Sequence, residues 1–172
     1  MKTTEIRGDN YSGEYTKTRT ACRGIVIENG SILLSYMAVT DCWMIPGGGL
    51  EANETAQECC IREFAEETGC IIRVSPCELQ IDEYYDDRKH VNRYYFGEIT
   101  GRTERRPTQL EEVTGMEPRW IPLEEAFGIF SKYEAWAGID EMRYWLYRRE
   151  YTALTELADR HQDSVSPDAS RG

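Results

Sequence analysis

The pattern of apolar and polar positions along the chain predicts a mixture of strands and helices. Residues 20–27 and 31–37 are rich in β-branched and other apolar side chains and flank a Glu-Asn-Gly turn at 28–30, so they predict two strands joined in a hairpin. Further apolar runs predict strands at 71–74, 79–85 and 91–99, with a charged turn at 86–89, and a last strand that ends with residues 120–123. A sheet built from these strands needs helices to cover it.

Helical spacing occurs in three places. The clearest helix is predicted from Thr55 to Thr68, because Thr55 and Glu58 form a capping box and Gly69 is a suitable C-cap. Small and apolar side chains on one stripe would let this helix lie close to a sheet: Ala56, Cys59, Cys60 and Phe64. Weaker periodicity predicts a short helix at 124–130 and a longer one at 139–158.

The remaining segments set the domain boundaries. The run 43–49 is broken by a proline and three glycines, which predicts a loop, and the polar stretch 101–118 is long enough for a functional loop. At 172 residues the chain has the length of one domain. We therefore predict a polar lead-in at 1–18, a single domain at 19–160 and a disordered tail at 161–172.

Composition, charge and cysteine spacing restrict the function classes. The chain carries 20 basic and 31 acidic residues, a formal net charge of -11, without a basic stripe, which argues against nucleic acid as a partner. No apolar signal segment and no membrane-spanning run is visible, so a cytoplasmic protein without membrane attachment is expected. The excess acid still suits a phosphorylated small molecule if bound cations invert the local field. The six cysteines show no CxxC pair or zinc-like spacing, which predicts reduced, mostly buried thiols.

The charges on the first helix are the strongest functional signal. Glu63, Glu66 and Glu67 share one face of its second half, where like charges repel and the helix dipole disfavours each carboxylate by about 0.3–1 kcal/mol. A solvated acidic face is the simplest alternative. The triple-glycine run at 47–49 favours a site instead, because its open backbone can approach a ligand. Clustered carboxylates and a backbone carbonyl are hard oxygen ligands of the kind that Mg²⁺ takes, usually together with phosphates.

These residues lie in a long pattern that resembles the Nudix box, G-x5-E-x7-R-E-U-x-E-E-x-G-U, where U is a bulky aliphatic residue. The pattern runs from Gly48 to Cys70 with every fixed letter present, and the two U positions hold Phe64 and Cys70, which are both apolar. The flanking sequence from about residue 19 to 130 is also similar to this family, including a W-x-x-P-G-G lead-in before the box and a W-I-P-L-E-E segment after it. The lead-in and the C-terminal helix lie outside the resemblance.

The resemblance implies an α/β fold, namely a Nudix-type α/β/α sandwich with a mixed central sheet, as a single domain plus a C-terminal helix. It implies Mg²⁺-dependent hydrolysis by metal-activated water, with Mn²⁺ as a substitute ion. The bond cleaved would be a diphosphate linkage in a nucleoside-diphosphate-linked substrate, such as a nucleoside triphosphate, a nucleotide sugar or ADP-ribose. By resemblance, the metal ligands are Glu63, Glu66, Glu67 and the Gly47 carbonyl, Arg62 belongs to the catalytic set, and Glu54 and Gly48 support them.

Several further residues are candidates whose roles stay open. Many relatives use another glutamate from the loop before the last strand as base or ligand, and spacing does not decide among Glu111, Glu112 and Glu117. Arg19 and Arg23 are candidates for phosphate contacts. Trp43 is a candidate for stacking on a base, although an aromatic residue beside a loop more often serves packing.

Two other functions fit parts of the sequence. A Nudix-like module that senses a nucleotide without cleaving it would usually lose box glutamates, which this chain keeps. Isomerisation of a prenyl diphosphate would need a dedicated cysteine and glutamate pair that the sequence does not place. The oligomeric state stays open, with a homodimer as one option, because Trp136, Tyr144 and Trp145 suit an interface as well as a core.

Overall fold

The computed structural model describes residues 1–163, with side chains up to residue 158. Its strands are β1 (Lys2–Arg7), β2 (Lys17–Ile25), β3 (Ile27–Glu28), β4 (Ser31–Met37), β5 (Cys42–Met44), β6 (Gly47–Gly49), β7 (Cys70–Val74), β8 (Leu79–Tyr85), β9 (Arg88–Arg102) and β10 (Met116–Pro122). Its helices are α1 (Ala56–Thr68), α2 (Gln109–Val113), α3 (Leu123–Phe130) and α4 (Glu141–Asp163), with a 3-10 turn η1 (Tyr133–Trp136).

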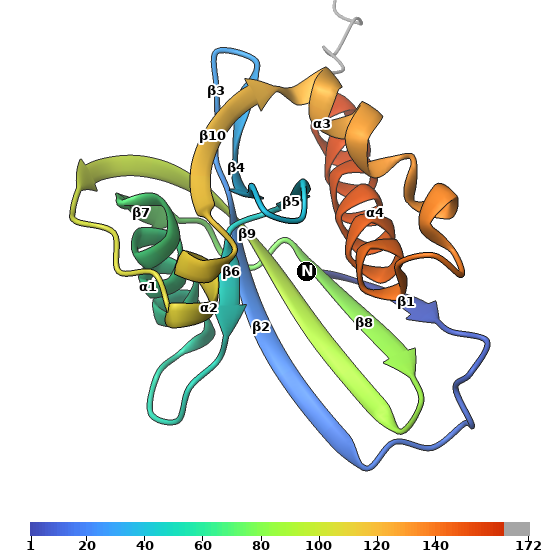
Figure 1. Cartoon of the computed structure of the whole chain (residues 1–172). Helices are drawn as coiled ribbons and strands as arrows, with labels where there is room; N and C mark the ends of the chain where they lie inside the picture. The colour runs from blue at the N-terminus through green and yellow to red at the C-terminus, as the bar shows by residue number, and fades with distance from the viewer. Residues whose placement is uncertain (164–172) are drawn as a thin grey trace, which may run out of the picture.

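The strands form two sheets that lie between layers of helix. The larger sheet has the order β1-β8-β9-β2-β6, and β7 pairs with the outer half of β9. It is mixed, because β1 with β8 and β2 with β9 run parallel while its other pairs are antiparallel. The smaller sheet has the order β10-β4-β3, with β5 also paired to β4. Figure 1 shows α1 on one side of the sheets and α3 and α4 on the other, which confirms the α/β/α arrangement.

Two apolar cores result from the alternation of side chains along the strands. Neighbouring residues of a strand point to opposite faces, so Tyr94 and Tyr95 of β9 enter different cores. The core beneath α1 includes Phe64 and Ile72, and the core beneath α3 and α4 includes Phe130 and Leu154. All six cysteines are free and five of them are buried, as expected for reduced packing residues.

Several local elements differ from the sequence-based expectation. The polar lead-in contains β1, which pairs with β8 through main-chain hydrogen bonds that need no apolar side chains. The expected hairpin is only the short β3–β4 pair, because residues up to Ile25 belong to β2 of the larger sheet. Its turn residues Asn29 (φ 51°) and Gly30 (φ 77°) do have the left-handed conformation that such turns need.

The segments predicted as loops also contain regular structure. Residues 43–49 contribute to β5 and β6, so the glycine run forms an edge strand that pairs with β2. The stretch 101–118 contains the end of β9, the short helix α2 and the start of β10. Residues 161–163 continue α4, and the remainder of the expected tail, 164–172, lies outside the described residues.

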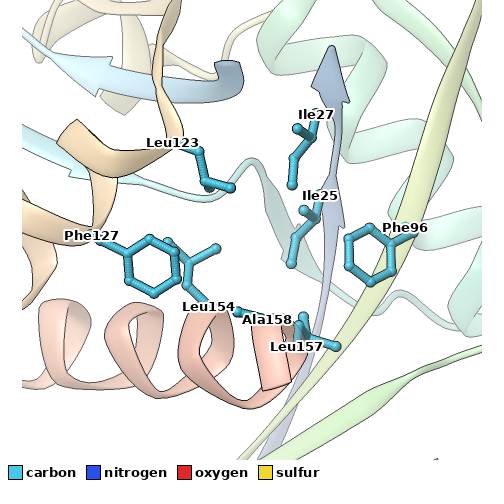
Figure 2. A pocket seen from close by; sticks show the side chains of 8 residues that line it. All are labelled: Ile25, Ile27, Phe96, Leu123, Phe127, Leu154, Leu157 and Ala158. Carbon is cyan, nitrogen blue, oxygen red and sulfur yellow. The ribbon is translucent and has the colours of Figure 1, made fainter. Parts of the chain in front are cut away.

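An apolar pocket of about 350 Å³ lies between α3, α4 and the end of β2 (Figure 2). The side chains that line it carry no polar group, which makes it unsuitable for a phosphate: Ile25, Ile27, Phe96, Leu123, Phe127, Leu154, Leu157 and Ala158. Among the described helices, none is both long enough and apolar enough to span a membrane.

Candidate active site

Helix α1 delivers the acidic residues to one place. Thr55 caps its N-terminus with a complete capping box to Glu58, and Gly69 ends it in the left-handed conformation at φ 70°. Cys59, Cys60 and Phe64 bury the inner stripe, as predicted. The helix is therefore fixed at both ends and along one side, which sets the positions of the glutamates in its second half.

Glu67 is the buried member of the acidic group, with 3% of its surface exposed. The Ser35 hydroxyl of β4 donates to Glu67 Oε2 at 2.5 Å, and the Gly47 N–H donates to Oε1 at 3.2 Å. Burial raises the pKa of Glu67 to about 8, the negative charge of Glu111 acts in the same direction, and the two hydrogen bonds oppose it. The carboxylate is therefore held directly at Gly47–Gly49, the residues of β6, which we call the glycine turn.

Arg62 organises the more exposed carboxylates. Its Nε and Nη2 donate to the two oxygens of Glu54 at 3.0 and 2.7 Å, a bidentate pair that lowers the pKa of Glu54 to about 2. Its Nη1 donates to Glu63 at 2.8 Å and to Glu66 at 3.2 Å. Burial raises the pKa of Glu63, although Arg62 opposes that shift. A bond from Nη2 to the Gly49 carbonyl at 3.2 Å also ties the helix to the glycine turn.

Two glycines are required by close approaches to β6, Gly47 by strand β2 and Gly48 by helix α1. Gly47 has φ 146°, and a Cβ there would lie 2.2 Å from the main-chain oxygen of Cys22. A Cβ on Gly48 would lie 2.4 Å from a carboxylate oxygen of Glu63. The absence of a side chain at Gly48 therefore leaves the space that the Glu63 carboxylate uses.

The C-terminal end of α1 receives a cation from outside the helix. The Arg105 guanidinium donates to the main-chain oxygen of Glu67 at 2.6 Å and to that of Met116 at 2.5 Å. A positive charge at this end of a helix offsets the negative end of the dipole. Arg105 therefore compensates part of the cost of the carboxylates and joins α1 to β10.

The three loop glutamates have different surroundings. Glu111 on α2 is half-buried, and its negative charge contributes to raising the pKa of both Glu63 and Glu67. Glu112 is exposed on the same helix, and Glu117 forms an ion pair with Arg119 on β10. Glu111 is thus the member of this group whose charge reaches the acidic cluster.

The other candidate residues, Arg19, Arg23 and Trp43, have different surroundings in the structure. Arg19 is exposed, and its guanidinium lies beside Gly49, 3.5 Å from where a Cβ would stand. Arg23 is buried and contacts main-chain carbonyl oxygens, so it does not lie on a surface where a phosphate would arrive. The Trp43 ring lies 4.5 Å from the Tyr36 ring, and its main-chain N–H donates to the Tyr147 hydroxyl at 3.2 Å.

The donor set suits a hard divalent cation. Three carboxylates and the Gly47 carbonyl offer oxygen atoms, and the missing side chain at Gly48 lets the Glu63 carboxylate approach the glycine turn. Within residues 1–163, no three acidic, histidine or cysteine side chains already converge on one point. Arg62 and Ser35 hold the carboxylates in hydrogen bonds instead, so coordination would require rotation of these side chains.

Three residues of this site did not follow from the sequence. Ser35 was indicated only as a polar position inside an apolar strand, and Arg105 lies in a stretch without a motif. Glu111 was one of three equivalent candidates, and the choice needed the position of α2. Each depends on contacts between segments that are distant in sequence.

The comparisons with known proteins agree with this geometry. The chain belongs to the NUDIX family, because the family model for the NUDIX domain matches residues 18–146. That range contains α1, the glycine turn and the strands from β2 to β10, and it ends within α4, while β1 of the larger sheet lies before it. The chain is therefore a hydrolase of the Nudix type.

Two relatives and one solved structure illustrate the range of the family. The chain is 28% identical over 131 residues to diphosphoinositol polyphosphate phosphohydrolase 3-beta of Homo sapiens, covering 75% of this chain and 78% of that protein. It is 33% identical over 81 residues to a putative 8-oxo-dGTP diphosphatase of Bacillus subtilis, covering 45% of this chain and 50% of that protein. A NUDIX hydrolase from Nitrosomonas europaea superposes with a TM-score of 0.54 at 18% identity, covering 62% of this chain and 74% of that chain, which shows the likeness of fold alone.

Proposed function

We propose that this hydrolase cleaves a diphosphate linkage in a nucleoside-diphosphate-linked small molecule and that it requires Mg²⁺. The observation that carries the proposal is the buried Glu67 carboxylate, which lies near the C-terminal end of α1 and accepts hydrogen bonds from the Ser35 hydroxyl and the Gly47 N–H. A carboxylate in this position lacks a stabilising role of its own, because burial and the helix dipole both disfavour its charge. Binding of a divalent cation supplies the reason for it.

The residues that would hold the ion are the three box glutamates and the glycine turn. Glu67 and Glu63 provide the principal carboxylate oxygens, Glu66 an additional one or a contact to coordinated water, and Gly47 its carbonyl. When bound, Mg²⁺ would polarise a phosphoryl oxygen and lower the pKa of a bound water towards neutrality. Arg62, braced by Glu54, limits the rotamers that Glu63 and Glu66 can adopt.

Glu111 is our proposed additional base or ligand. Its position on α2 brings its charge to bear on Glu63 and Glu67, whereas the carboxylate of Glu117 is engaged by Arg119. Its carboxylate accepts from the Thr108 N–H at 2.7 Å, so the short helix fixes its direction. A carboxylate beside the acidic cluster can accept the proton of an attacking water.

The substrate is proposed only as a class. The two relatives described above are named for an inositol diphosphate and for an oxidised nucleotide, which share a diphosphate bond and little else. Arg19 is the proposed phosphate contact, since it is exposed beside the glycine turn. Trp43 and Tyr36 form an aromatic pair that remains the candidate for contact with a base.

A substrate panel tests this function. Nucleoside triphosphates, nucleotide sugars, ADP-ribose and dinucleoside polyphosphates are incubated with the chain in the presence of Mg²⁺, of Mn²⁺ or of a chelator, and the products are separated by ion-exchange chromatography. We expect turnover of at least one substrate that depends on the divalent ion. Tight binding of a nucleotide in calorimetry without turnover of any panel member would contradict the proposal and indicate a sensor.

A further inference from the structure

A buried group of charged side chains connects the C-terminal helix with the larger sheet. On α4, Glu150 has no exposed surface, and Arg149 beside it is also buried. Arg149 Nη2 donates to Glu150 Oε1 at 2.7 Å, and the Tyr94 hydroxyl of β9 donates to Oε2 at 3.0 Å. Both oxygens of this carboxylate therefore have donors in the interior.

Arg23 of β2 extends this group to the glycine turn. Its Nη1 lies 3.9 Å from Glu150 Oε1. The same nitrogen donates to the main-chain oxygen of Ile45 at 3.1 Å and to that of Gly47 at 3.5 Å. One guanidinium thus links α4 to the carbonyl that we propose as a metal ligand.

Two residues of the larger sheet complete the network. Glu83 accepts from Asn92 Nδ2 at 2.8 Å and from Arg149 Nη1 at 3.4 Å. Asn92 Oδ1 accepts from Arg23 Nε at 3.4 Å. The charges of two arginines and two glutamates therefore cancel: Arg23, Arg149, Glu83 and Glu150. Because burying ions is costly, apolar side chains in their place would stabilise the fold equally well. A role in fixing geometry is the better reason for their presence.

We propose that Arg149 and Glu150 position the active site through Arg23. The guanidinium of Arg23 holds the Gly47 carbonyl, while the Gly47 N–H donates to Glu67, so both sides of this residue are fixed between the network and the acidic helix. Gly47 has no alternative support from a side chain of its own, and its φ of 146° is a conformation that few residues adopt. This inference rests on the proposed function, because it uses the roles assigned there to Gly47 and Glu67.

The network acts outside the sequence motif. Arg149 and Glu150 lie some eighty residues beyond the box and belong to a helix that the resemblance does not cover. Without the negative charge of Glu150, Arg23 retains Asn92 as its side-chain partner and is drawn towards Glu83 behind it. The turn carbonyl then loses the donor that fixes its direction.

The test measures metal affinity and local protection on the whole chain without substrate. The variants are Glu150→Gln, Tyr94→Phe and Arg23→Lys, and the probe is Mn²⁺ alone in titration calorimetry. We expect the Mn²⁺ dissociation constant to rise about ten-fold in Glu150→Gln, the usual size of effects from residues that orient metal ligands. Tyr94→Phe should act in the same direction and by less. Hydrogen exchange is measured in the metal-free proteins. Compared with the wild type, exchange in Glu150→Gln and Tyr94→Phe should accelerate at the Gly47 amide more than at the amides of β4.

Matched controls separate positioning from general stability. Leu154→Ala removes an apolar contact one turn beyond Glu150 and enlarges the pocket of Figure 2 without touching the network. It should lower the melting temperature and leave the Mn²⁺ dissociation constant and the Gly47 exchange rate unchanged. Arg23→Lys should retain more affinity than Arg23→Met, because lysine keeps one donor for the turn carbonyls.

The outcomes test the positioning role of the network separately from the proposed metal-dependent function. Wild-type affinity and wild-type Gly47 exchange in both Glu150→Gln and Tyr94→Phe would overturn the positioning role, as would equal losses in Leu154→Ala. If Glu150→Gln does not fold, Tyr94→Phe and Arg23→Lys decide the question. A wild-type chain that binds neither Mn²⁺ nor Mg²⁺ removes the proposed function, and the Gly47 exchange rates still report separately on the network.

Discussion

The Ser35 hydroxyl donates a 2.5 Å hydrogen bond to the Glu67 carboxylate in the interior of the molecule, where strand β4 faces the end of helix α1. The bond joins the smaller sheet to helix α1. It also gives Glu67 Oε2 a partner, while Oε1 takes the Gly47 N–H. The acidic helix is therefore anchored to two different strands through one side chain.

Replacing Ser35 with Ala should destabilise the metal-free protein. The change leaves a buried carboxylate oxygen without its donor, which costs about 1–3 kcal/mol. The free energy of unfolding in urea is the measurement. Ser131→Ala serves as control, because the Ser131 hydroxyl bonds the Gly128 carbonyl at an exposed position. Equal unfolding midpoints for the two variants would show that the Ser35 bond contributes nothing.

Gly48→Ala should separate activity from folding. Its Cβ would meet the Glu63 carboxylate at 2.4 Å, so the carboxylate must move, whereas a Cβ at Gly49 meets only the flexible Arg19 guanidinium at 3.5 Å. We expect Gly48→Ala to lose on the order of 100-fold in kcat/KM with little change in melting temperature. Gly49→Ala should keep most of the activity. Similar kinetics for the two variants would contradict the assigned position of Glu63.

Arg62→Lys should impair catalysis although the charge is kept. Lysine cannot form the bidentate pair with Glu54 and still reach Glu63, so the carboxylates lose their fixed rotamers. A fall in kcat of about 10–100-fold is expected in steady-state kinetics at saturating Mg²⁺. The matched control is Arg73→Lys, whose partner Glu98 is exposed on the surface. A wild-type kcat in Arg62→Lys would rule out this orienting role.

His90 should make the protein less stable in mild acid. Burial, with further contributions from nearby arginines, lowers the pKa of His90 to about 4 from an ordinary value of 6.5. The unfolded chain therefore binds the proton first, and stability present above pH 6.5 is lost as the pH falls towards 4. Urea midpoints measured between pH 7 and 4.5 should decline less in His90→Gln than in the wild type. Parallel curves would contradict the shift. The Tyr85 hydroxyl contacts the His90 ring, and the positive charges that add to the effect of burial are those of Arg19, Arg149, Arg88 and Arg23.

Local sequence signals predicted helix α1 more fully than the strands around it. The capping box at Thr55 and the C-cap at Gly69 fixed both ends of α1, because these depend on neighbours in sequence. The glycine run was expected to be a loop, yet it is strand β6, because its hydrogen bonds go to β2 more than twenty residues away. Edge pairing of this kind leaves little trace in the hydrophobic pattern.

The contacts that support the site were hidden for the same reason. Arg23 was a candidate for a phosphate contact, because cleavage of a phosphate linkage needs cationic contacts, but its guanidinium lies in the interior beside Glu150 and main-chain carbonyls. The choice of Glu111 over its neighbours likewise depended on the folded chain, in which the charge of Glu111 acts on Glu63 and Glu67. A single sequence records which residues are present, and only the fold determines which of them meet.

The central claim is that Glu67 binds a catalytic divalent ion, and the most direct test is the rate of diphosphate hydrolysis by Glu67→Gln at saturating Mg²⁺. Glutamine keeps the size of the side chain, and its one oxygen can accept from the Gly47 N–H while its NH2 group donates to the Ser35 hydroxyl, so the fold should remain and the melting temperature should change little. We expect kcat to fall by on the order of 100-fold or more, together with loss of Mn²⁺ binding in calorimetry. Wild-type turnover and wild-type Mn²⁺ affinity in a folded Glu67→Gln protein would contradict the account.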